Sequence, residues 1–198
     1  MTRTRVVAAV AAVLGLVCAI ALVLAVGSST VGGYVSENGV AGSPHATLYR
    51  IGVFGIAVVA ALLAFALRKS QALAALPLAL AAPLITVSGA VSCTAGCPLP
   101  PYEPTTAADL IHAIASVLGV GCCALAMLAL AWRGTGPSRL VSRVAVATGF
   151  PLLAATAVGI AAVGRGSLTG VLERLGLTVC ALWLVTIGAL HAAAERTP

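Results

Sequence analysis

Residues 6–26 read VVAAVAAVLGLVCAIALVLAV, an unbroken apolar run without a charged side chain. A helix needs roughly 20 such residues to cross the hydrocarbon core of a bilayer. Further, predominantly apolar runs follow at about 45–67, 71–91, 107–132, 141–163 and 170–192. None of them alternates apolar and polar residues as a barrel strand does. The sequence therefore predicts an all-α membrane protein, a six-helix transmembrane bundle that forms one integral-membrane domain over residues 1–198.

The composition excludes the other broad classes of protein. Of the 198 residues, 61% are hydrophobic and 8% are charged, and the mean hydropathy is +1.12. Soluble domains are about 45–50% apolar and about 25% charged, and disordered chains are poor in apolar residues. The net charge of +6 comes from 11 basic residues that are spread thinly, unlike the basic patch of a nucleic-acid-binding protein. We expect membrane lipids as partners and no nucleic acid.

The first apolar run has a second interpretation. Arg3 and Arg5 precede it, and Ala25-Val26-Gly27-Ser28 loosely resembles a signal-peptide cleavage site. The apolar core of a cleaved signal peptide is about 7–15 residues long, and residues 6–26 exceed that length. A retained helix is therefore the favoured interpretation.

The lysine and arginine residues predict how the bundle is oriented. Those on the side of both termini are Arg3, Arg5, Arg68, Lys69, Arg133, Arg139, Arg143 and Arg196. Those on the opposite side are Arg50, Arg165 and Arg174. Cytoplasmic loops carry the excess of basic residues, so both termini are predicted to be cytoplasmic. The preference for arginine over lysine, with abundant alanine and glycine, fits a GC-rich source, and we expect a multi-pass protein of the bacterial cell membrane.

Most of the acidic residues and histidines fall on the predicted extracytoplasmic side. They are Glu37, Glu103, Asp109, Glu173, His45 and His112, whereas His191 and Glu195 lie at the cytoplasmic end. The two long connections, at about 27–44 and 92–106, are also extracytoplasmic, and loops of this length are often functional. The functional residues should therefore be sought on that side.

The second long connection contains Ser-Cys-Thr-Ala-Gly-Cys-Pro at residues 92–98. A tight turn between Cys93 and Cys97 can bring their Cα atoms within bonding distance, and disulfides persist on an oxidising side of a membrane. A disulfide is the favoured interpretation, with free thiols or a metal site as alternatives. No second cysteine pair or closely spaced histidine pair accompanies them, so we expect no metal site.

The fourth span begins with a polar cluster that permits two interpretations. Asp109 and His112 are three residues apart and share one helix face, an arrangement in which a carboxylate can orient an imidazole for catalysis or ligand binding. Thr106 and Asp109 also fit a capping box, which would use the carboxylate to bind the first amides of the helix. Ser116 can donate to the carbonyl of His112. His112 has no such local explanation, and an ionisable residue within a span indicates function.

The first long connection contains the other candidate residues. Ser36 and Glu37 precede an Asn-Gly turn signal, and His45 and Arg50 follow at the start of the second span. We expect Glu37 to pair with Arg50, to accept a hydrogen bond from His45, or to be solvated. Arg165, Glu173 and Arg174 flank the sixth span, where anchoring at the membrane interface is the usual role.

Three features of the chain carry a resemblance to a known family. They are Val-Ser-Glu-Asn-Gly at 35–39, Cys-Pro-Leu-Pro-Pro at 97–101 followed by Thr-Thr-Ala-Ala-Asp-Leu-Ile-His at 105–112, and the six-span hydropathy. Together they resemble the bacterial membrane-protein family called domain of unknown function 998. A more distant similarity, through the Ser-acid-x-Gly segment, is to the DRAM/Sfk-type six-span proteins. The resemblance implies a fold and a topology but no activity, and it points to Ser36, Glu37, Gly39, Asp109 and His112.

Three functions fit this sequence. The first is a protein without enzymatic activity that binds a lipid or other apolar ligand beneath its extracytoplasmic loops, through Ser36, Glu37, His45, Arg50, Asp109 and His112. The second is an enzyme that acts on lipid headgroups, with His112 as base and Asp109 or Glu37 as its partner. The third is a small transporter or an accessory subunit of a membrane complex. The sequence contains no nucleotide, zinc-protease or hydrolase motif, so no cofactor is expected.

Overall fold

The computed structural model describes residues 3–27 and 32–194, which form six α-helices and one short 3-10 helix. In chain order these are α1 (Arg3–Gly27), η1 (Val35–Gly39), α2 (Ala46–Leu67), α3 (Ala72–Ala90), α4 (Ala107–Arg133), α5 (Gly136–Ala162) and α6 (Ser167–Ala193). All six α-helices are long and apolar enough to cross a membrane, which confirms the predicted all-α, six-helix bundle. The described residues do not include Ser28 of the possible cleavage site, nor Glu195 and Arg196 at the predicted cytoplasmic end.

The helix boundaries agree closely with the predicted spans except at the start of α5. That helix begins at Gly136, and the predicted span begins near residue 141. Pro137 lies in its first turn, where the fixed φ of proline favours the start of a helix. As a result, Arg139 lies on α5 and not in the connection before it.

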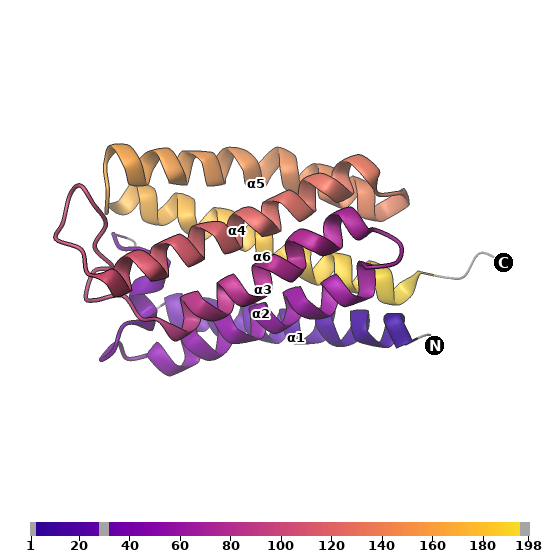
Figure 1. The fold of residues 1–198 in the computed structure, drawn as a ribbon, viewed down its shortest axis with the longest axis horizontal. Coiled ribbons are helices and arrows are strands. Elements are labelled where there is room, and N and C mark those ends of the chain that lie inside the picture. Colours follow the sequence, from indigo (N-terminus) through magenta and orange to yellow (C-terminus); the bar gives the residue numbers. More distant parts are fainter. Residues whose placement is uncertain (1–2, 28–31, 195–198) are drawn as a thin grey trace.

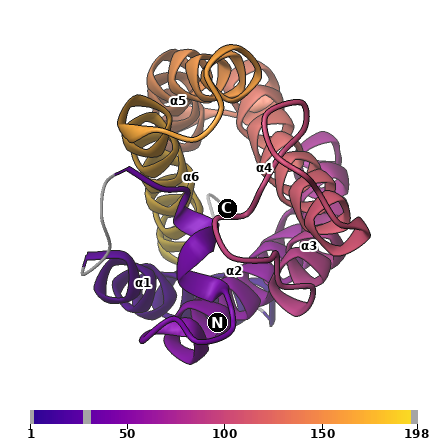
Figure 2. The ribbon, with the colours of Figure 1, turned by 90° about the vertical axis from the view of Figure 1, so that its left-hand side faces the viewer.

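The helices form a closed ring in chain order (Figure 2). Each helix packs against its neighbours in the chain, α1 closes the ring against α6, and α6 also contacts α2 and α4 across the ring. Successive helices run in opposite directions, so α1 begins and α6 ends at the same end of the bundle (Figure 1). The first helix therefore forms one wall of the bundle.

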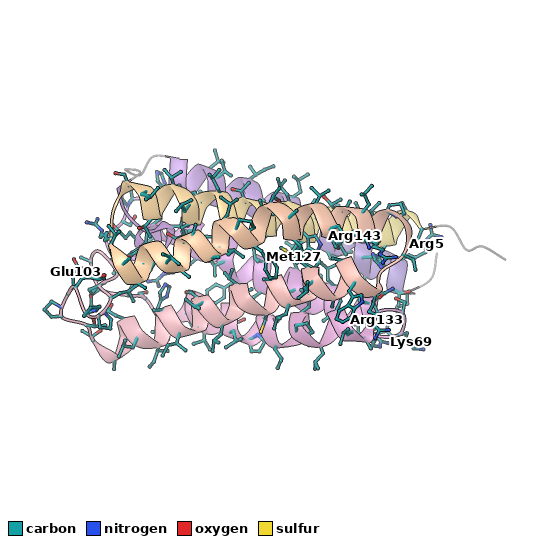
Figure 3. All side chains as sticks on the ribbon, turned by 90° about the horizontal axis from the view of Figure 1, so that it is seen from above. Arg5, Lys69, Glu103, Met127, Arg133 and Arg143 are labelled. Atoms are coloured by element: carbon teal, nitrogen blue, oxygen red, sulfur yellow. A yellow bond between two sulfur atoms is a disulfide. The ribbon has the colours of Figure 1, made fainter. Side chains whose placement is uncertain are left out.

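The two ends of the bundle differ in chemistry. We call one the basic end, because it holds the described residues Arg3, Arg5, Arg68, Lys69, Arg133, Arg139 and Arg143. We call the other the loop end, because the two long connections at 32–45 and 91–106 lie there. Figure 3 shows Arg5, Lys69, Arg133 and Arg143 at the basic end and Glu103 at the loop end. The positive-inside rule continues to predict that the basic end is cytoplasmic.

The apolar core lies in the half of the bundle nearer the basic end. Its largest fully buried side chains include Leu63, Leu67, Met127 and Leu130. Trp183 on α6 is also buried there, and its Nε1 donates a hydrogen bond of 3.0 Å to Ser142 Oγ on α5. This bond satisfies the indole N–H, which would otherwise be costly to bury. The outward faces of the helices carry exposed apolar side chains instead, as expected for a protein surrounded by lipid.

Close helix approach at small residues allows the ring to close. A Cβ atom added to Gly188 on α6 would lie 3.1 Å from the Ala8 carbonyl oxygen and 3.1 Å from the Ala12 Cβ on α1. In lipid, small residues at such interfaces let helix backbones approach and pack. The contact between α1 and α6 therefore depends on the absence of a side chain at Gly188.

We predict that Gly188→Leu lowers the thermal unfolding midpoint of the purified protein, because overpacking an interface costs about 1–3 kcal/mol. Gly121→Leu is the matched control, since a Cβ atom at Gly121 would meet nothing within 4 Å. Thermal scans of both variants in the same detergent measure the difference. Equal midpoints for the two variants would contradict the assigned role of the α1–α6 contact.

Candidate functional site

The first long connection folds across the loop end as a cap (Figure 2). We call residues 32–45 the first cap loop; η1 lies at its centre. Glu173 Oε2 on α6 accepts a hydrogen bond of 2.9 Å from the Val35 amide, and Arg174 Nη1 donates one of 2.9 Å to the Gly33 carbonyl. Glu173 therefore holds the cap in place, a more specific contact than the interface anchoring predicted for it.

Glu37 has a different partner from those predicted. Its carboxylate accepts hydrogen bonds of 2.6 and 2.7 Å from Nε and Nη2 of Arg165, in the turn between α5 and α6, and one of 2.8 Å from the Tyr34 amide. The expected pairing with Arg50 or His45 was wrong, because ring closure brings the α5–α6 turn beside η1. The hydrogen bond to Glu37 raises the pKa of the Arg165 guanidinium. Glu37 thus links the first cap loop to the α5–α6 turn.

The second long connection, residues 91–106, forms a second cap loop around a disulfide. Cys93 and Cys97 are bonded, with their Cα atoms 5.0 Å apart, as predicted. Tyr34 of the first cap loop is buried against both cysteines. Burial raises the pKa of its phenol to about 12, so the side chain that joins the two cap loops is neutral at physiological pH.

Asp109 anchors the second cap loop to α4. Its carboxylate accepts hydrogen bonds from the amide and hydroxyl of Thr94, at 2.6 and 3.1 Å, and from those of Thr106, at 2.9 and 2.7 Å. Thr106 Oγ1 in turn accepts from the Asp109 amide, which confirms the predicted capping box. The four hydrogen bonds give this carboxylate a structural role.

His112 binds the end of α3 and makes no hydrogen bond to a carboxylate within the described residues. Its Nδ1 lies 2.8 Å from both the Ser88 and Val91 carbonyl oxygens. Because both partners are acceptors, Nδ1 carries the proton, and the ring caps carbonyls that α3 leaves unpaired at its C-terminus. The pairing with Asp109 considered from the sequence is therefore not formed. Ser116 Oγ donates to the His112 carbonyl at 2.8 Å, as predicted.

A small cavity lies between the two cap loops and the ends of α2, α3 and α4. Its volume is about 10 Å³, which accommodates roughly one water molecule. The polar side chains that line it are Ser36, Arg50, Ser88, Ser92, Tyr49 and His112. Of the six predicted binding residues, the cavity brings together Ser36, Arg50 and His112. Glu37, Asp109 and His45 do not line it.

Arg50 is the charged residue of this cavity. Its Nε and Nη2 donate to the Gly39 carbonyl at 3.1 and 3.0 Å, and Nη2 also donates to Ser92 Oγ. The guanidinium is half-buried, yet within the described part of the chain no carboxylate pairs with it, and the single ion pair found there joins Arg165 to Glu37. The cavity thus combines a positive charge with hydroxyl groups and no acidic side chain.

Two residues that line the cavity were missed in the sequence. Ser88 lies in the last turn of α3, and Ser92 lies beyond the end of that helix in the second cap loop, so helix periodicity does not group them. Both serines line the same cavity as Arg50 of α2, which donates a hydrogen bond to Ser92. No group of three or more metal-binding side chains occurs among residues 3–27 and 32–194.

The fold and the cap define a class: a multi-pass, all-α membrane protein. Its six helices form a ring, and two loops, one of which contains a disulfide, cover one end of the ring. The chain belongs to the family described as Protein of unknown function (DUF998), whose model matches residues 6–190. No curated protein and no solved structure matches the chain. The sequence resemblance to this family is confirmed, and it extends over nearly the whole bundle.

We predict that alkylation under denaturing conditions without reductant labels only the four free cysteines, Cys18, Cys122, Cys123 and Cys180. After reduction, all six cysteines should be labelled. Intact-mass measurement gives the number of labels without and with reductant. A Cys93→Ser variant should take five labels in either condition, whereas six labels on the unreduced wild-type protein would contradict the disulfide.

We also predict that Glu37→Ala destabilises the protein more than Arg165→Ala does. Glu37 loses both the Arg165 pair and the bond from the Tyr34 amide, whereas Arg165 loses only the pair. The coupling energy in a double-mutant cycle should be about 0.2–1 kcal/mol, because the Arg165 side chain is 42% exposed. Denaturant titration of the four proteins measures it, and equal single-variant costs would contradict the role given to the Tyr34 amide.

Proposed function

We propose that this protein binds an amphiphile with an oxyanion headgroup beneath the cap at the loop end, and that it has no enzymatic activity. The observation that carries the proposal is the half-buried guanidinium of Arg50, which faces a hydroxyl-lined cavity without a carboxylate partner among the described residues. Removing a charge from water is costly unless a group of opposite charge compensates it. An oxyanion from outside the chain would supply that compensation.

The chemistry around Arg50 matches an oxyanion. A guanidinium presents donors in a planar fork that suits phosphate and carboxylate oxygens, and serine hydroxyls add further donors. Ser36, Ser88 and Ser92 are the serines of the cavity, and Tyr49 is a fourth hydroxyl residue that lines it. A volume of about 10 Å³ accommodates one headgroup oxygen and excludes a whole headgroup, so binding requires the first cap loop to move.

The position of Arg50 favours an amphiphile over a free anion. Arg50 lies in the second turn of α2, and Phe54, one turn further, shares its helix face and is 37% exposed. Ile51, beside Arg50, is 59% exposed. A headgroup at Arg50 can therefore continue into an acyl chain along an apolar surface.

The cap has one connection that can open at low cost. The Arg165 and Glu37 side chains are 42% and 21% exposed, and ion pairs of this kind contribute about 0–1 kcal/mol. The first cap loop is also held by contacts of η1 with α1, α2 and α6, and by Tyr34 against the disulfide of the second cap loop. We infer that displacement of η1 from the α5–α6 turn admits the headgroup.

The alternative of a headgroup-processing enzyme has less support. A general base needs a free lone pair within reach of its substrate and a partner that orients it. The His112 lone pair is on Nε2, 3.5 Å from Ser116 Oγ, and among the described residues no carboxylate orients the ring, because Nδ1 donates to backbone carbonyls. The Asp109 carboxylate is occupied by Thr94 and Thr106. We further propose that the protein resides in the bacterial cell membrane with its basic end in the cytoplasm, as the distribution of arginines predicts.

We predict that dodecyl phosphate raises the thermal unfolding midpoint of the wild-type protein in dodecyl maltoside micelles, because a ligand that binds the folded state stabilises it. In Arg50→Gln the apparent affinity should fall by roughly tenfold or more, since a hydrogen bond to a charged group contributes about 1.5–3 kcal/mol. Arg133→Gln removes the same charge at the basic end, and His45→Gln changes the first cap loop outside the cavity. Both controls should behave as wild type.

The other outcomes of this experiment each overturn part of the proposal. An equal loss in Arg133→Gln would indicate a general effect of net charge. Stabilisation by inorganic phosphate at the same concentration would assign the site to a free anion. Recovery of dodecanol from the sample would indicate hydrolysis of the headgroup and favour the enzyme.

A further inference from the structure

A second feature lies at the opposite end of the molecule, in a groove between α2 and α3. Its volume is about 450 Å³, within the range of roughly 300–1,000 Å³ that ligand sites occupy. Alanines form most of its walls: Ala61, Ala64, Ala72, Ala75 and Ala79. The groove is separate from the cavity at Arg50, because it occupies the half of both helices nearer the basic end.

The sequence explains why the groove exists. Each helix contributes one residue stripe at positions i, i+3, i+4 and i+7, which is 61, 64, 65 and 68 on α2 and 72, 75, 76 and 79 on α3. Alanine occupies two of the four positions on the α2 stripe and three of the four on the α3 stripe, so short side chains face each other where larger ones would meet. Ala61, Ala72 and Ala79 remain exposed, and Leu76 is 64% exposed. The groove therefore opens to the surrounding lipid.

Positive charge surrounds the end of the groove nearest the α2–α3 turn. The Arg68 guanidinium lies 3.4 Å from the centroid of the Phe65 ring and donates a hydrogen bond of 3.0 Å to the Phe65 carbonyl. The Arg3 guanidinium from α1 lies 5.8 Å from the same ring, and Lys69 follows directly in the chain. The acidic residues of the described ranges, by contrast, belong to the loop end: Glu37, Glu103, Asp109 and Glu173.

We propose that this groove binds an anionic phospholipid, with one acyl chain along the alanines and the phosphate at Arg68, Arg3 and Lys69. The argument is charge complementarity joined to an apolar channel. A phospholipid has an anionic group at one end of an apolar chain, and basic pockets between membrane helices hold such headgroups. Phe65 holds the Arg68 guanidinium at the end of the groove, which reduces the entropy lost when the phosphate binds.

This site does not rest on the proposed function at the loop end. The two sites share no residue, and they lie at opposite ends of the bundle. If the Arg50 cavity bound no ligand, the α2–α3 groove could still bind a phospholipid. If the basic end is cytoplasmic, as the sequence predicts, the phospholipid belongs to the cytoplasmic leaflet.

Native mass spectrometry of the purified protein with phosphatidylglycerol or phosphatidylcholine of equal chain length tests the proposal. We expect the wild-type protein to retain phosphatidylglycerol in preference to phosphatidylcholine. Arg68→Gln should reduce that retention about fivefold, the effect of one basic residue beside an anionic headgroup. Ala79→Leu, which fills the groove from an exposed position, should reduce it through lost space for the acyl chain.

Two variants serve as matched controls. Arg133→Gln removes a basic-end charge outside the groove, and Ala147→Leu adds the same side chain at an exposed position on α5. Both should retain phosphatidylglycerol as the wild type does. Equal retention of the two lipids, or equal losses in a variant and its control, would overturn the proposal. A dimer that dissociates in Ala79→Leu would assign the groove to a second copy of the chain and also overturn it.

Discussion

The lack of hydrogen-bond partners in hydrocarbon is the constraint on which this structure depends. Within the spans, most amides and carbonyls pair inside their own helix, except where Pro77 and Pro83 in α3 and Pro151 in α5 lack an N–H, so the chain can cross the bilayer repeatedly. The helices then associate without a hydrophobic force between them, through close packing at small residues. Gly188 against Ala8 and Ala12 closes the ring, and Gly119 allows α4 to approach Ile85 of α3. These contacts set the positions of the loops that follow.

The same constraint explains what the charged residues of the loop end bind. Backbone groups at helix ends and in loops have no partner within a helix, and these side chains supply their hydrogen bonds. Carboxylates accept from amides there: Glu37 from Tyr34, Glu173 from Val35, and Asp109 from Thr94 and Thr106. Cationic and imidazole groups donate to carbonyls: Arg50 to Gly39, Arg174 to Gly33, and His112 to Ser88 and Val91. Most candidate site residues thus have a structural role. Arg50 differs because its charge faces a cavity without an acidic partner in the described part of the chain.

The local parts of the site were predictable because their partners lie within a few residues. The capping box of Thr106 and Asp109 spans three residues, and the disulfide of Cys93 and Cys97 spans four. The partner of Glu37 was not predictable, because Arg165 is 128 residues away. Arg50 and His45 are nearer to Glu37 in sequence, and sequence distance alone favours them as partners. The cavity itself, built by three helices and two cap loops, has no signature in any one segment.

The sequence by itself determined that six helices cross a membrane and that the bases and most acids separate to opposite ends. Length and apolarity of each run decide the first point, and the alternation of the runs along the chain decides the second. Only the tertiary structure decided that the helices close into a ring, that Arg50 and His112 share a cavity, and that Glu37 binds Arg165. Helix formation depends on neighbours four residues apart, whereas these contacts depend on how separate helices pack together.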